Sequence, residues 1–142
     1  MTEETQLVIM LRDKASGFLE KEYAAISLAE LGEFEALLVN VYAEREGGET
    51  LIHVKLSTAR DVEDWQFSAV FDYYDEDVFA GLAEVREVED VFNPTWELVF
   101  AAPAGTSAEL AAKVKGLLEI HSRELADVFE AIAGKESEYT DE

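Results

Sequence analysis

Residues 106–134, TSAELAAKVKGLLEIHSRELADVFEAIAG, contain the pattern that decides the fold. A stripe of mainly apolar residues returns every three or four positions, which is the spacing of one face of an α-helix. Thr106 followed by Glu109 predicts a capping box at its start, and Gly134 predicts its end. A helix over 107–133 would be about 40 Å long, which is enough to cross one face of a sheet. The stripe consists of Leu110, Val114, Leu117, His121, Leu125, Val128 and Ile132.

The first half of the chain predicts antiparallel strands, because short runs rich in branched and aromatic residues alternate with turn residues. The paired glycines in loop 46–49 favour a hairpin between two of these runs, since glycine reaches positive φ without strain. Strands are expected at 6–13, 17–26, 33–45 and 51–57.

The strand predicted at 51–57 has one apolar side. Ile52, Val54 and Leu56 point one way in an extended chain, and His53 and Lys55 point the other way. His53 is therefore expected to face solvent or a covering layer, away from the apolar side.

Residues 61–92 allow two interpretations. The alternation of Trp65, Phe67, Ala69, Phe71 and Tyr73 is typical of a strand, which we favour because a helix would leave Phe67 and Phe71 on its polar side. The acidic run at 61–64 resembles a helix start instead. Further along the chain we expect a short helical turn at 75–81, a strand or continued helix at 83–92, and a strand at 95–102.

These elements predict a single α+β domain over residues 1–142: an antiparallel β-sheet of about six to seven strands, packed on by a long C-terminal helix. The polar segment 135–142 is expected to be a frayed acidic tail.

The composition combines a large core with a strongly acidic surface. Apolar residues make up 49% of the 142 residues, which excludes a disordered chain, and the formal net charge is −21. Such a charge disfavours binding to nucleic acid or to an anionic membrane. The chain has no cysteine for disulfides or thiolate chemistry. The acidic N-terminus and the lack of a long apolar run lead us to expect a cytoplasmic location.

No catalytic motif stands out in the sequence. His121 falls within the apolar stripe, so we interpret it as a core histidine with a hydrogen-bonded ring, and a ligand-binding or catalytic role is the alternative. Phosphate-binding loops, the HExxH motif and EF-hand spacing are absent from the sequence. We therefore predict no catalytic residues, no metal site and no cofactor.

The densest polar cluster is 72–77, DYYDED. Helix capping accounts for Asp75 and Asp77 without a metal. Tyr73 and Tyr74 would point opposite ways, which leaves one tyrosine outside the core beside carboxylates, an arrangement suited to a basic peptide or protein. The predicted binding residues are Trp65, Asp72, Tyr73, Tyr74, Asp75 and Asp77.

The sequence thus predicts a non-enzymatic acidic protein-interaction module. Its expected partner is a basic protein or peptide, or a second copy of the chain in a homodimer. One alternative is a protein that masks a basic client, either as a chaperone or immunity-type protein or as a DNA mimic. Another is a small enzyme that uses His121 or a pair of carboxylates.

Overall fold

The computed structural model describes residues 6–13, 15–16, 19–46, 48–89, 91–103 and 107–139. In this part of the chain, a six-stranded sheet has the order β2-β1-β3-β4-β6-β5. The strands are β1 (Gln6–Asp13), β2 (Leu19–Ser27), β3 (Leu38–Glu46), β4 (Glu49–Leu56), β5 (Glu84–Glu87) and β6 (Trp96–Ala101). The helical elements are α1 (Leu28–Leu31), the 3₁₀ turn η1 (Gly32–Leu37), α2 (Asp64–Tyr73), the 3₁₀ turn η2 (Glu76–Phe79), α3 (Ser107–Ile132) and α4 (Glu136–Tyr139).

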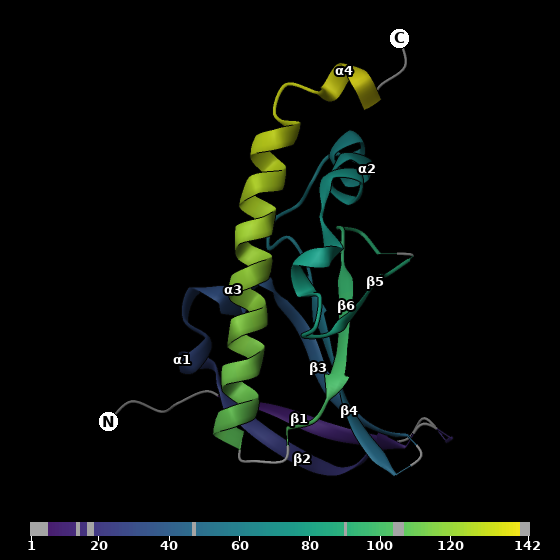
Figure 1. Cartoon of the computed structure of the whole chain (residues 1–142), viewed down its shortest axis with the longest axis vertical. Coiled ribbons are helices and arrows are strands. Elements are labelled where there is room, and N and C mark those ends of the chain that lie inside the picture. The colour runs from purple at the N-terminus through teal and green to yellow at the C-terminus, as the bar shows by residue number, and fades with distance from the viewer. Residues whose placement is uncertain are drawn as a thin grey trace.

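The long helix α3 confirms the prediction from the apolar stripe. It runs along one face of the sheet, and β1 and β2 cross the lower end of β3, β4 and β6 at a steep angle (Figure 1). All seven residues of the stripe are buried. Gly134, just after the helix, has φ +83° and so supplies the left-handed residue that ends it. The predicted cap at Thr106 lies outside the described residues.

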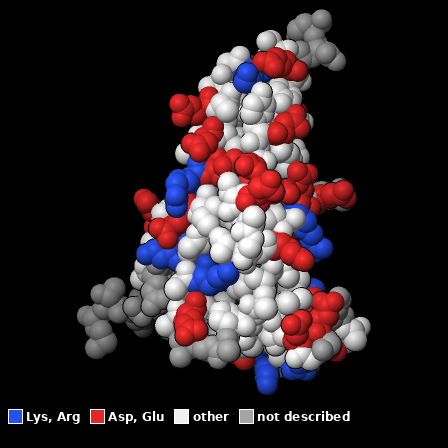
Figure 2. All heavy atoms as spheres, viewed as in Figure 1, with Lys and Arg blue, Asp and Glu red and all other residues white. Residues whose placement is uncertain are grey.

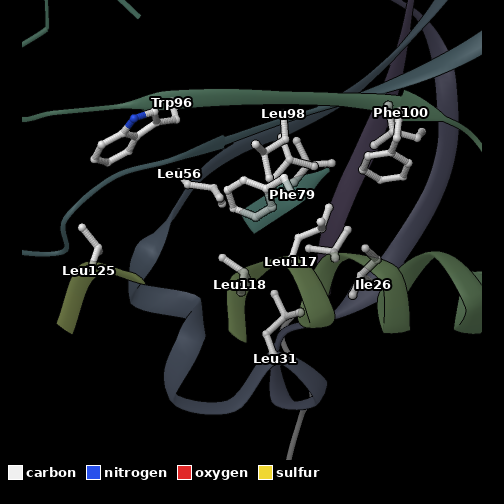
Figure 3. Packing of buried hydrophobic residues seen from close by; sticks show 14 of the residues in the cluster. Ile26, Leu31, Leu56, Phe79, Trp96, Leu98, Phe100, Leu117, Leu118 and Leu125 are labelled. Carbon is white, nitrogen blue, oxygen red and sulfur yellow. The ribbon is translucent and has the colours of Figure 1, made fainter. Parts of the chain in front are cut away.

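The core lies between α3 and the sheet. Trp96, Leu98 and Phe100 alternate along β6, so their side chains point to the same side, toward α3 (Figure 3). Phe79 of η2 and Leu117 of α3 meet them there, and both are buried. The period of two in the strand and the mixed spacing of three and four in the helix therefore supply the two apolar surfaces of one core.

The sheet is mixed, so the prediction of a purely antiparallel sheet is wrong. β1 pairs antiparallel with β2 but parallel with β3, through Leu11↔Ala43 and its two neighbours. The cause is the connection 28–37, which forms α1 and η1. β2 ends beside the start of β1, and the connection carries the chain to the other side of β1, so β3 then runs in the direction of β1.

The hairpin between β3 and β4 confirms the prediction from the paired glycines. Glu46 pairs with Glu49, and Gly48 in the loop has φ +89°. The first of the two strands is shorter than expected, because residues 33–37 belong to the 3₁₀ turn η1 and the strand begins at Leu38.

Residues 64–73 form the helix α2, so the preferred strand interpretation is wrong. The start is fixed by a reciprocal capping box between Glu63 and Gln66. Ala69 and Val70 are both buried, which a helix permits for adjacent residues. Phe67 and Phe71 are four residues apart and pack edge to face, with ring centroids 5.2 Å apart, on the half-buried side of the helix. The expectation that a helix would leave them on its polar side is therefore wrong.

Of the remaining predictions for the second half of the chain, the helical turn and the strands are confirmed and the frayed tail is not. The short helical turn expected at 75–81 is η2, and the ambiguous segment 83–92 contains the strand β5. The strand expected at 95–102 is β6. Part of the segment expected to be a frayed tail instead forms α4, whose Tyr139 packs against Trp65 with ring centroids 6.3 Å apart.

Replacement of Leu117 by alanine tests the packing of α3 on the sheet. Leu117 is 1% exposed, so we expect the free energy of unfolding to fall by about 2–5 kcal/mol, measured by chemical denaturation. Lys115→Ala, at an exposed position of the same helix, should change it by less than about 0.5 kcal/mol. Equal losses in the two variants would contradict this packing.

Candidate functional site

The face of the sheet that turns away from α3 carries a row of ionisable side chains. Successive side chains of a strand point to opposite faces, so burial of Ile52 and Val54 against α3 places His53 on the other face. Four neighbouring strands add one charged residue each on that same face. We call this set the charged row; it consists of Arg12 on β1, Glu44 on β3, His53 on β4, Glu97 on β6 and Arg86 on β5.

The charged row alternates in sign on both sides of His53. At one end the Nε of Arg12 donates a hydrogen bond of 2.9 Å to Glu44. Glu44 Oε1 lies 3.4 Å from His53 Nε2, and Glu97 Oε1 lies 3.5 Å from His53 Nδ1. At the other end Arg86 donates a hydrogen bond to Glu97. The row therefore joins five strands through short polar contacts.

The centre of the row is buried although it lies on the face away from α3. Glu44, His53 and Glu97 are 4%, 7% and 2% exposed. Tyr42 stacks on the His53 ring with centroids 4.6 Å apart and planes 8° apart. Buried carboxylates are costly unless paired, so the two arginines are needed to hold the row in place. Accordingly, the hydrogen bond to Glu44 raises the pKa of the Arg12 guanidinium.

His53 is the unusual member of the row. Within the described part of the chain, neither of its ring nitrogens makes a hydrogen bond, although carboxylate oxygens lie 3.4 and 3.5 Å from them. Buried polar atoms nearly always have a partner, and exceptions call for an explanation such as a ligand. A metal does not fit: the two carboxylates lie at different ring nitrogens and do not converge. No group of three potential metal ligands occurs among the described residues.

A depression of about 440 Å³ lies over the charged row, and an adjoining one of about 800 Å³ shares part of its wall. Together they are lined by five carboxylates and two guanidinium groups, a formal charge of −3 with His53 neutral. We call the two together the acidic depression. Such a wall favours a cationic ligand over an anionic one. The carboxylates are those of Glu44, Glu46, Glu49, Glu84 and Glu97.

The second histidine, His121, belongs to the core, which confirms its interpretation from the sequence. Its Nε2 lies 2.7 Å from the carbonyl oxygen of Ser57, which can only accept, so Nε2 carries the proton. Nδ1 then accepts a hydrogen bond of 2.7 Å from the Tyr74 hydroxyl. Burial lowers the pKa of His121 to about 4, and His121 is fully buried.

The binding residues predicted from the sequence have several different roles. Tyr74 is 7% exposed and bonds to His121, and burial raises its pKa. Asp75 caps η2 by accepting a hydrogen bond from the backbone nitrogen of Asp77.

The other predicted residues lie nearer the surface. Asp72 accepts a hydrogen bond of 2.9 Å from Tyr139, and Trp65 donates one of 2.8 Å to Glu63. Tyr73 is the tyrosine left outside the core, at 39% exposed. The six residues are therefore shared between the core, a helix cap and the packing of α4 on α2.

Sequence reasoning missed every member of the charged row except His53, whose face was predicted correctly. The signal that was available is the alternation in β6, where Glu97 lies between the buried Trp96 and Leu98. A carboxylate in such a position faces the side away from the core. The strand order was needed to see that this carboxylate lies beside His53.

Residues 2–140 match DUF6762, which is described as a family of unknown function. The chain belongs to this family. Neither a curated protein nor a solved structure matches the chain. Among the described helices, none is both long and apolar enough to cross a membrane.

The protonation of His121 predicts how stability depends on pH. The unfolded chain takes up a proton near pH 6.5, whereas the folded chain resists it until about pH 4. The unfolded state therefore binds more protons in this window, and the free energy of unfolding falls as the pH falls. Between pH 7.5 and 4.5 this residue should account for a loss of about 2–3 kcal/mol.

The measurement is chemical denaturation of the wild type and His121→Gln at both pH values. The variant should be less stable at pH 7.5 but should lose less stability on acidification, because glutamine does not titrate. An equal loss in both proteins would contradict the buried neutral imidazole.

Proposed function

We propose that this chain is a non-enzymatic acidic module that binds a basic protein or peptide at the acidic depression. The observation that carries the proposal is His53, buried between Glu44 and Glu97 with two ring nitrogens that lack hydrogen bonds in the described structure. A site of this kind is arranged for a polar ligand, and the surplus of carboxylates around it selects for positive charge.

The charge of the whole chain supports the same partner class. A net charge of −21 attracts a basic partner over a distance and speeds its encounter, while the depression supplies the place where it is held. Figure 2 shows acidic side chains spread over the face that carries α3, with Lys and Arg between them. This spread favours long-range attraction over a single docking patch on that face.

Titration calorimetry with a short peptide of alternating glycine and arginine tests the proposal. Binding is expected at low ionic strength and should weaken as salt is added, because salt screens exposed charges. The double variant Glu49→Gln/Glu84→Gln removes two exposed carboxylates from the wall. Its affinity should fall about three- to tenfold.

The matched control is Glu119→Gln/Glu130→Gln, which removes the same charge from exposed positions of α3. It should bind within about twofold of the wild type, since these positions face away from the sheet. Equal weakening of the two double variants would mean that overall charge, and not the acidic depression, governs binding. Absence of binding at low ionic strength would refute the proposal.

A small enzyme is the second candidate, favoured by the carboxylate pair Glu44 and Glu97 on either side of His53. His121 is a poor candidate for this role because both of its ring nitrogens are bonded within the core. The two candidates differ in the fate of the bound molecule. Recovery of an unchanged peptide after prolonged incubation supports the binding module, and conversion of the peptide supports the enzyme.

Masking of a basic client remains a narrower form of the proposed function, in which the partner is a chaperone client, a toxin or a DNA-binding protein. A DNA mimic would need carboxylates in rows at phosphate-like spacing. The mixed charges over the face in Figure 2 do not favour that arrangement. Competition with DNA for a basic protein distinguishes this form, since a mimic should displace the DNA at low salt.

A further inference from the structure

The two arginines at the ends of the charged row are held very differently. The Arg12 side chain is 37% exposed, whereas the Arg86 side chain is 69% exposed. Each covers a carboxylate that is almost completely buried, with side-chain exposures of 6% for Glu44 and 2% for Glu97. Arg86 is thus a largely solvated side chain placed over a deeply buried charge.

Arg12 has several contacts that fix it. Its Nε and Nη2 both donate to Glu44, and Nη2 also donates a hydrogen bond of 3.3 Å to the Tyr42 hydroxyl. Its guanidinium carbon lies 4.6 Å from the centre of the Tyr42 ring, a favourable cation–π contact. These contacts tie Arg12 to the middle of the sheet.

Arg86 comes from the edge of the sheet. Its strand β5 has four residues and pairs with β6, and Arg86 directly faces Glu97 in that pairing. Its Nη2 donates a hydrogen bond to Glu97 Oε1. This same oxygen is the one that lies 3.5 Å from His53 Nδ1. Release of Arg86 would therefore free the Glu97 oxygen that lies beside His53 Nδ1.

We infer that the acidic depression binds an arginine side chain of the partner, whose guanidinium takes the place of Arg86 on Glu97. This inference rests on the proposed function and names the group that is recognised. The exchange keeps the buried carboxylate paired with a guanidinium throughout. Arg86 loses little on release, because most of its side chain is already in water.

The site chemistry favours arginine over lysine. A guanidinium is planar and weakly hydrated, so it enters a buried carboxylate site at lower cost than an ammonium group. Its several donors can reach a carboxylate through two parallel bonds, whereas Arg86 reaches Glu97 through Nη2. The depression of about 440 Å³ over Glu97 and His53 has room for the guanidinium and its alkyl stem.

Arg86→Gln tests the exchange, because it removes the intramolecular competitor and leaves Glu97 without a cation. Affinity for the glycine–arginine peptide should rise at least about fivefold over the wild type, measured by calorimetry at low ionic strength. The matched peptide of glycine and lysine should gain less. Arg123→Gln makes the same change in net charge at an exposed position of α3, and it should bind like the wild type.

A second variant, Arg86→Lys, keeps the test decisive even if Arg86→Gln does not fold. Arg86→Lys keeps a positive charge over Glu97 but removes the planar group, so its affinity for the arginine peptide should lie between those of the wild type and Arg86→Gln. Imidazole NMR signals then locate the site, since the chain has two histidines. Addition of the arginine peptide should shift the signals of His53 and leave those of His121 unchanged.

The outcomes separate this inference from the proposed function. If the wild type binds the arginine peptide but Arg86→Gln and Arg86→Lys bind it no more tightly, the exchange is refuted while the proposed function stands. Weaker binding by both variants would make Arg86 a direct contact of the ligand and also refute the exchange. If neither the wild type nor the variants bind either peptide, the proposed function itself fails.

Discussion

The alternation of side chains along β4 is the constraint on which the rest of the structure depends. Ile52 and Val54 face α3 and complete the core. Because successive side chains of an extended strand point to opposite faces, His53 lies on the other face. The same parity in β3 and β6 brings Glu44 and Glu97 beside it. A one-residue slip in pairing would expose the core and dismantle the charged row together. The same strand register therefore determines both the core and the candidate site.

Local patterns in the sequence were sufficient for elements that obey a single period. The apolar stripe of α3 and the alternation of β4 both express one face buried against one partner, so their residues alone predict them. Residues 64–73 violate this condition. Their aromatic residues happen to alternate, while the decisive feature, adjacent burial of Ala69 and Val70, depends on contacts that no local pattern records.

Long-range arrangement explains what the sequence did not predict. The parallel pairing of β1 with β3 depends on where the connection 28–37 takes the chain, and a prediction from strand patterns alone assumes a simple meander. The charged row needs the complete strand order, because Arg12 and Glu97 lie far apart in the sequence and meet through the strands between them. By contrast, the residues of the cluster 72–77 are neighbours in sequence but not in environment, because Tyr74 turns into the core.

The two edges of the sheet bear on how copies of this chain could associate. The strand β5 ends the sheet with exposed Glu84, Arg86 and Glu87, and β2 ends it with exposed Lys21 and Glu22 beside irregular pairing to β1. Charged side chains and irregular edges oppose the addition of another strand. Self-association into extended β-assemblies is therefore disfavoured at both ends of the sheet.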